Sequence, residues 1–253
     1  MEPLFDSDKS ARPPVGRLWL EAVSAMTPMP RKVVLAAHRG APRGDGHPVL
    51  IVPGFLRGEG YMQPLYRFLT ARGYAVQGWR LGVNLGPTDR ILEGLERRLD
   101  EIVARHGRKA SLVGHSLGGA LARQLAKQRL EQVRQLIVLA SPIRVPTASQ
   151  LEPLYRLLAP WHSPNLPSLY LGINEPPDVP VTALHTCSDG IVAWQSCLEV
   201  PGPRRENIEV RGNHSTLPSN PEVLLILAER LAQPEAVWRP YEGRRSRSST
   251  PGR

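Results

Sequence analysis

Short apolar runs alternate with longer segments of helical periodicity from residue 49 onward. The runs have the length of strands, whereas the longer segments repeat apolar residues every three or four positions, which is typical of amphipathic helices. This alternation predicts an α/β fold with a mostly parallel sheet of about six strands flanked by helices. The predicted strands span residues 49–53, 75–79, 110–114, 136–140, 181–186 and 208–210.

The clearest helical pattern begins after Thr88, which can cap a helix, and ends at Gly107. Within it, apolar residues recur at three- and four-residue spacing. Two other helices have clear start signals: Pro64 suits a first helical position, and Asn220 can cap a helix that begins after it. Further helices are predicted over 17–26, 64–72, 117–130 and 221–231.

Residues 141–180 interrupt the alternation between the fourth and fifth predicted strands. This segment holds nine prolines and is too long for a plain connection. Leu151, Leu154, Tyr155 and Leu158 would share one face of a short helix within it. That face either completes the core or forms a cap over a binding cleft. We therefore expect an N-terminal extension and linker over 1–48, a main domain over 49–238 with a cap insertion at 141–180, and a tail at 239–253.

The composition excludes several protein classes. With 41% hydrophobic and 22% charged residues, a chain of 253 residues can bury one sizeable core, so wholesale disorder is excluded. No apolar run reaches the roughly 18 to 20 residues of a membrane-spanning helix. Glu2, Asp6 and Asp8 stand where a secretory signal carries positive charge. These features predict a cytoplasmic protein that is not an integral membrane protein.

Charge and cysteine content add two expectations. The formal net charge is +9. Residues 239–253 contain five arginines and one glutamate, so this stretch contributes +4 of that charge. We interpret this stretch as a solvated, disordered tail and do not expect a nucleic-acid partner, although the tail could dock on an acidic partner. Cys187 and Cys197 alone make neither a disulfide framework nor a four-ligand zinc pattern. We expect both thiols to be reduced and buried, and no metal or cofactor.

Gly114, Ser116 and Gly118 form a Gly-x-Ser-x-Gly pattern at the junction between a predicted strand and a predicted helix. A serine nucleophile in that position needs a sharp turn, and glycine on either side removes the side chains that would clash. The helix that follows also favours negative charge beside the hydroxyl. The alternative is a serine that merely caps the helix, but we predict that Ser116 is a nucleophile.

A serine nucleophile needs a base to take its proton, and histidine is the usual one. Seven histidines are present. His214 follows the last predicted strand, so in a parallel sheet it lies at the same carboxyl edge as Ser116. We therefore predict His214 as the base. We expect His115 to be buried beside the nucleophile, and His162 could contact substrate from the cap insertion. His185 lies inside a predicted strand, His106 ends a predicted helix, and His38 and His47 lie in poorly patterned sequence.

The base in turn needs a carboxylate that fixes its tautomer and stabilises the imidazolium. Asp189 follows the predicted strand 181–186 and precedes Gly190. Glu175 and Asp178 precede that strand and would emerge at the opposite edge. Asp189 is therefore the predicted acid, against the alternative that Asp-Gly simply forms a turn.

The order Ser116, Asp189, His214 is that of the α/β-hydrolase arrangement. With PVLIVPGF, GHSLGG, SDGIV and the GNH loop, residues 48–234 resemble the α/β-hydrolase superfamily, particularly its bacterial esterase and lipase-like members. The resemblance implies an oxyanion hole made by the backbone N–H groups of Phe55 and Leu117. Many relatives have His-Gly where this chain has Pro53-Gly54, so a histidine side-chain contact is lost there. The segment 80–88 also resembles this group but has no assigned role.

These residues together predict a serine hydrolase that cleaves carboxylic esters through an acyl-enzyme on Ser116. The apolar face in 141–180 suggests a small-molecule or lipid-like ester as substrate. An acyltransferase or thioesterase on the same three residues, and a non-catalytic binding protein of the same fold, remain alternatives. The sequence leaves the oligomeric state open.

Overall fold

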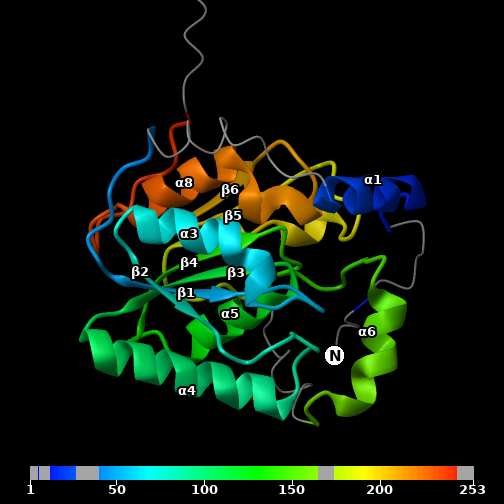
Figure 1. The fold of residues 1–253 in the computed structure, drawn as a ribbon, viewed down its shortest axis with the longest axis horizontal. Coiled ribbons are helices and arrows are strands. Elements are labelled where there is room, and N and C mark those ends of the chain that lie inside the picture. Colours follow the sequence, from blue (N-terminus) through cyan, green and yellow to red (C-terminus); the bar gives the residue numbers. More distant parts are fainter. Residues whose placement is uncertain (1–4, 6–11, 27–39, 165–173, 244–253) are drawn as a thin grey trace, which may run out of the picture.

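A single parallel sheet of six strands forms the centre of the protein, in the order β2-β1-β3-β4-β5-β6 (Figure 1). The computed structural model describes residues 5, 12–26, 40–164 and 174–243. The sheet confirms the predicted architecture, since all five strand pairs are parallel. The strands are β1 Pro48–Val52, β2 Ala75–Gly78, β3 Ala110–His115, β4 Val133–Leu139, β5 Val181–His185 and β6 Arg205–Glu209.

Helices cover both faces of the sheet, with α3 and α8 on one face and α4 and α5 on the other (Figure 1). Alternate strand residues explain this arrangement: Val49 and Ile51 pack under α3 and α8, whereas Leu50 and Val52 pack against α4 and α5. The α-helices are α1 Val15–Met26, α3 Gln63–Ala71, α4 Asp89–His106, α5 Leu117–Gln128, α6 Glu152–Leu158 and α8 Pro221–Leu231. The 3₁₀ helices are η2 Glu59–Met62, η3 Ala159–Trp161, η4 Trp194–Cys197 and η5 His214–Ser219.

Local capping sets the helix limits that the sequence predicts. The Thr88 hydroxyl accepts the N–H of Ile91 at 3.3 Å, and Gly107 ends α4 with a φ of 61°, in the left-handed region that favours glycine. The Asn220 side chain accepts the N–H of Glu222 at 2.9 Å and so starts α8. These termini agree with the predicted ones because the capping residues act within one turn of the chain.

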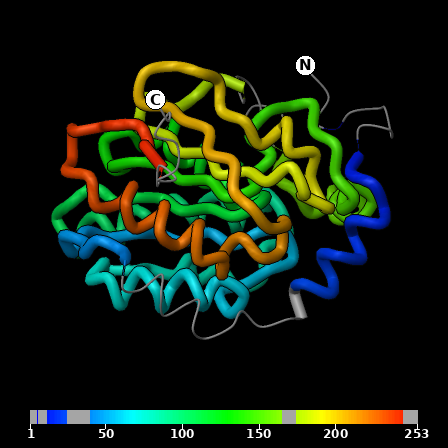
Figure 2. The backbone as a smooth tube through the Cα atoms, turned by 90° about the horizontal axis from the view of Figure 1, so that it is seen from above, coloured from blue at the N-terminus to red at the C-terminus, as the bar shows by residue number. Residues whose placement is uncertain are grey.

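The loops after β3, β5 and β6 emerge at the same edge of the sheet because these strands run parallel. Two peripheral helices, α1 and α6, lie at this edge, and Figure 2 shows α1 alongside the later segments of the chain. None of the described helices is long and apolar enough to cross a membrane. Part of the N-terminal extension, part of the insertion and residues 244–253 of the tail lie outside the described residues. The expectation of a disordered tail is wrong for its first residues, because the N–H of Tyr241 donates to Oε2 of Glu206 at 2.6 Å and its side chain packs against the core.

A buried ion pair ties α5 to the segment between η4 and β6. Nη2 of Arg123 lies 3.1 Å from Oε1 of Glu199, and the two side chains are 1% and 0% exposed. Removing one charge of such a pair leaves the other buried without compensation, which costs far more than loss of an exposed pair.

We therefore expect Glu199→Gln to lower the free energy of unfolding by about 3 kcal/mol. The matched control is Glu93→Gln, because Glu93 pairs with Arg97 at 3.2 Å on the surface of α4, where both side chains are more than 60% exposed. That change should cost less than about 0.5 kcal/mol. Urea unfolding followed by circular dichroism measures both, and equal effects would contradict the prediction.

Candidate active site

Ser116 occupies a strained turn between β3 and α5. Its φ of 53° and ψ of −131° lie where residues with a side chain are rarely found. The turn depends on a close approach at Gly118, where any side chain would collide with the carbonyl oxygens of Val52 and Pro53. The sequence pattern predicts this geometry, and the side chain of Ser116 remains only slightly exposed at 7%.

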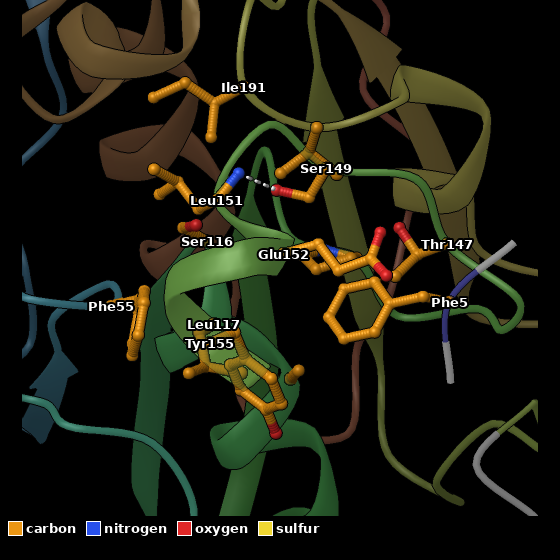
Figure 3. Close-up of a pocket in the computed structure, with 13 residues that line it drawn as sticks. Phe5, Phe55, Ser116, Leu117, Thr147, Ser149, Leu151, Glu152, Tyr155 and Ile191 are labelled. Carbon is orange, nitrogen blue, oxygen red and sulfur yellow. Dashed lines mark hydrogen bonds between the residues drawn. The ribbon is translucent and has the colours of Figure 1, made fainter. Parts of the chain in front are cut away.

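Two cavities meet at Ser116. The smaller one has a volume of about 60 Å³ and a mostly apolar lining, and the larger one has a volume of about 340 Å³. In Figure 3, Phe55 lies on one side of Ser116, with Phe5 and Glu152 on the other. The larger cavity includes Arg57, Tyr61 and His214. Ser116 is thus accessible from an apolar side and from a side that carries the predicted base.

Asp189 and His214 form a buried hydrogen-bonded pair. Nδ1 of His214 lies 2.7 Å from Oδ2 of Asp189, and the side chains are 4% and 1% exposed. The other carboxylate oxygen, Oδ1, accepts the N–H groups of Ile191 and Val192, each at 2.8 Å. Asp189 is therefore held by its own loop and presents one oxygen to the imidazole. The structure brings these two predicted residues together and places Ser116 and His214 at the same cavity.

Opposing effects set the charge of His214. Burial lowers the pKa of this histidine, but the charge and hydrogen bond of Asp189 and the charge of Glu21 outweigh burial, so its pKa is raised above the ordinary value of 6.5. Arg57 acts in the opposite direction and weakens the shift. The carboxylates around the ring thus favour the imidazolium that a general base becomes when it takes a proton.

Side chains also fix the backbone of residues 214 and 215. Nε2 of His115 donates to the carbonyl oxygen of His214 at 3.0 Å, and the Tyr61 hydroxyl donates to that of Ser215 at 2.6 Å. Burial lowers the pKa of His115 well below its ordinary value and raises that of Tyr61 to about 12, so His115 is neutral and Tyr61 keeps its proton. The Glu21 carboxylate accepts both N–H groups of this segment. Both peptide units are thereby held in place.

The predicted oxyanion donors border the smaller cavity together with Ser116. Within the part of the chain that the structure describes, the N–H groups of Phe55 and Leu117 donate to no other residue. The loop that carries Phe55 is held by Asn84, whose Nδ2 donates to the carbonyl oxygen of Pro53 at 2.8 Å. The backbone of Asn84 also pairs with Leu56 and Arg57 at 2.7 and 2.9 Å. Asn84 gives segment 80–88 a role that the sequence left open.

The other candidates lie elsewhere. His162 is half-buried, and its Nε2 lies 3.3 Å from the carbonyl oxygen of Leu85 rather than at either cavity. Asp178 and Glu175 precede β5, as predicted, and Asp178 pairs with Arg204 on the surface. His47, His106 and His185 also lie away from Ser116, and His38 is outside the described residues.

The two cysteines are free, and neither lines a cavity at Ser116. Cys197 is buried as predicted, whereas the prediction of burial is wrong for Cys187, which is only partly buried because it lies in the loop after β5. Burial raises the pKa of Cys197 well above its ordinary value, which favours an inert thiol. Among the described residues, His185, Cys187 and Glu209 could hold a metal ion, since their ligand atoms lie within 4.8 Å of one another. Burial and the neighbouring Glu209 raise the pKa of the Cys187 thiol. The geometry around Ser116 does not involve this group.

Sequence reasoning missed Glu21 and Asn84, which hold the two sides of the site. Glu21 attracted notice only because it interrupts an apolar stretch, yet a lone carboxylate among Leu18, Trp19, Leu20 and Val23 is a signal that it has buried partners. Asn84 sits between glycines in a segment without strand or helix periodicity. Its partners are loop carbonyl and amide groups, which no sequence pattern identifies.

Comparison with known families places the chain among hydrolases. Residues 46–189 match the sequence model of a family described as serine aminopeptidase, S33. The match spans more than half of the chain and includes Ser116 and Asp189, whereas His214 lies beyond it.

Solved structures with the same fold include lipases and esterases. Lipase B of Aspergillus fumigatus aligns with a TM-score of 0.59 at 17% identity, over 74% of this chain and 52% of the lipase. The carboxylesterase EstE1, from a metagenomic library, aligns with a TM-score of 0.55 at 14% identity, over 81% and 96%. A monoglyceride lipase from Saccharomyces cerevisiae aligns with a TM-score of 0.55 at 16% identity, over 76% and 89%. At these identities the likeness establishes the fold.

The raised pKa of His214 generates a prediction. Asp189→Asn should lower the pKa of His214 below 6.5, because burial then dominates. In the wild type the stabilisation linked to His214 is complete below about pH 6.5 and is lost as pH rises through the raised pKa of the folded protein. An NMR titration of the ring nitrogens measures the pKa in both proteins. An unchanged value in the variant would contradict the assigned cause.

Proposed function

This chain belongs to the serine aminopeptidase S33 family of α/β hydrolases, and from that premise we propose that it hydrolyses carboxylic esters through an acyl-enzyme on Ser116. One observation carries the proposal: the buried 2.7 Å hydrogen bond between Asp189 and His214, at a cavity that also opens onto the strained Ser116 turn. Membership of the family makes the chain a hydrolase, and the proposals of an ester substrate and of Ser116 as nucleophile rest on these residues.

In the first half of the reaction the Ser116 hydroxyl attacks the ester carbonyl. Nδ1 of His214 is bonded to Asp189, so Nε2 is the atom that takes the hydroxyl proton and later gives it to the leaving alcohol. Asp189 keeps the ring in this tautomer and stabilises the imidazolium. Water then attacks the acyl-enzyme, gives its proton to Nε2 and releases the acid with Ser116 restored.

The tetrahedral intermediates carry negative charge on the former carbonyl oxygen. We assign its stabilisation to the N–H groups of Phe55 and Leu117, which border the cavity at Ser116 and have no other acceptor among the described residues. Each such donor contributes roughly 3 to 4 kcal/mol in measured enzymes. Asn84 supports the loop of Phe55 through its hydrogen bond to the carbonyl oxygen of Pro53.

The unequal cavities support a division of the ester between them. The cavity of about 60 Å³ is apolar and bounded by Leu151, Tyr155 and Val192, so it suits a short acyl group. The cavity of about 340 Å³ holds Arg57 and Tyr61 and suits a larger alcohol. Helix α6 contributes to the smaller cavity through Tyr155, which is 8% exposed, while Leu157 on its outer side is 66% exposed. This arrangement favours a cap that limits acyl length over one that binds a long chain.

A fluorophosphonate probe tests the nucleophile. It should label the wild-type protein at Ser116 and fail to label Ser116→Ala, because only an activated serine reacts. Ser219→Ala is a matched control, since Ser219 lies in η5 outside both cavities and its hydroxyl donates to the Thr216 carbonyl oxygen at 3.1 Å. Mass spectrometry locates the adduct. Equal labelling of Ser116→Ala and wild type, or no labelling of the wild type, would refute the assignment.

The size of the smaller cavity predicts acyl-chain selectivity. We expect kcat/KM for p-nitrophenyl acetate and butyrate to exceed that for laurate by at least about tenfold, since a cavity of about 60 Å³ beside Tyr155 can hold a short acyl chain but only part of a long one. Tyr155→Ala should narrow this ratio by opening the cavity. A wild-type preference for laurate would instead favour a cap that binds lipid chains.

A further inference from the structure

Helix α1 inserts one carboxylate between the two loops that carry the proposed acid and base. Oε1 of Glu21 accepts the N–H of Gly190 at 3.0 Å and that of His214 at 2.8 Å, and Oε2 accepts the N–H of Ser215 at 2.8 Å. Gly190 follows Asp189 directly in the loop after β5, and His214 begins η5 after β6. The Glu21 side chain thus bonds to both loops, and each bonded residue lies more than 160 positions after Glu21 in the sequence.

The burial of Glu21 is compensated by these three bonds. The residue is 2% exposed, and no ion pair among the described residues includes it. A buried carboxylate is costly unless its oxygens accept hydrogen bonds, and bonds from N–H groups to a charged acceptor are the stronger kind. The carboxylate and the three amides therefore satisfy one another, and removing the carboxylate would leave three buried donors without their acceptor.

Apolar burial explains only part of why α1 lies here. Leu18 packs, partly buried, against Ile191 and Val192, but Trp19 and Val23 are 74% and 57% exposed. Among the described side chains of α1, the buried one is the glutamate. Polar contacts add to the docking: Nη1 of Arg17 donates to the Cys187 carbonyl oxygen at 2.8 Å, beside the bonds of Glu21. This reverses the usual pattern of a surface helix and makes Glu21 the anchor of α1.

Gly190 gives independent support for this approach. Its φ is not in the left-handed region, so the backbone there does not require glycine. A side chain at position 190, however, would lie 2.7 Å from the carbonyl oxygen of Arg17 and 2.8 Å from Cγ of Glu21. Glycine after Asp189 thus provides space for α1 rather than a special turn.

We propose that Glu21 is a positioning residue, which joins the loop of Asp189 to the loop of His214 and keeps their side chains in hydrogen-bonding register. The inference rests on the proposed function, because it assigns Glu21 a part in orienting that acid and base. Glu21 acts through main-chain groups, and its own oxygens are occupied by the three amides.

The carboxylate also affects the proton affinity of the base. The charged and titratable groups that face His214 are Asp189 from the loop after β5, Glu21 from α1, Arg57 from the loop after β1, and His115 from β3. Asp189 and Glu21 raise the pKa of His214, whereas Arg57 lowers it and His115 is neutral. Loss of the Glu21 charge should therefore shift the acidic limb of the kcat/KM profile to lower pH.

Two substitutions separate the charge of Glu21 from its reach. Glu21→Gln keeps the length but turns an amide donor toward at least one backbone N–H, and Glu21→Asp keeps the charge but is one methylene too short to bond both loops. We expect both to reduce kcat for p-nitrophenyl acetate by about 10- to 100-fold, a loss typical of misplacing catalytic groups. Only Glu21→Gln should move the acidic limb to lower pH. Arg17→Met is the matched control, because it weakens α1 docking and leaves the three bonds intact, and it should cost less than about threefold.

Amide hydrogen exchange provides the direct structural readout. The N–H groups of Gly190, His214 and Ser215 should be protected from exchange in the wild type. They should exchange faster in Glu21→Gln and Glu21→Asp, once thermal unfolding has shown that both variants are folded. Unprotected amides in the wild type would overturn the inference without any variant. So would wild-type kcat in both Glu21 variants, or a loss no larger than that of Arg17→Met with an unchanged pH profile. A wild-type protein that neither reacts with fluorophosphonate nor hydrolyses the ester would instead refute the proposed function.

Discussion

The buried hydrogen bond between Asp189 and His214 is the interaction on which the site depends. It joins loops that follow different strands, and it forms because β5 and β6 are parallel and end at the same edge. Both groups are nearly inaccessible to water, so their attraction is strong, but each also needs further partners for its remaining polar atoms. The surrounding structure supplies them through the amides of Ile191 and Val192 and through the contacts of residues 214 and 215.

The fold was predictable because its signals are local. Short apolar runs predict the strands that are buried on both faces of the sheet. A capping residue before each of α4 and α8, and a glycine after α4, act within a few residues. The sheet and these helix limits therefore follow from the sequence. The placement of Ser116, Asp189 and His214 at one edge follows from strand direction alone. Their catalytic roles stay a proposal that the labelling and kinetic experiments decide.

The supporting contacts could not be predicted, because they join residues distant in the chain through single hydrogen bonds. Asn84 lies 31 residues from the Pro53 carbonyl that it holds, and Glu21 lies 193 residues from His214. No periodicity records such a pair: an isolated carboxylate in an apolar stretch indicates that buried partners exist, but it does not identify them. The orientation of α1 could not be predicted either. Its apolar residues face outward and its glutamate faces the protein, whereas the usual pattern places the apolar face of a helix inward.

Helix α1 precedes the region that the family shares, which begins at residue 46. A fragment that began at residue 46 and kept the rest of the chain would retain the six strands, the Ser116 turn and the loops of Asp189 and His214. Water would then have to replace the Glu21 carboxylate as acceptor for the amides of Gly190, His214 and Ser215. A helix that precedes the matched region thus contacts the loops of the proposed acid and base, and an alignment limited to residues 46–189 does not include it.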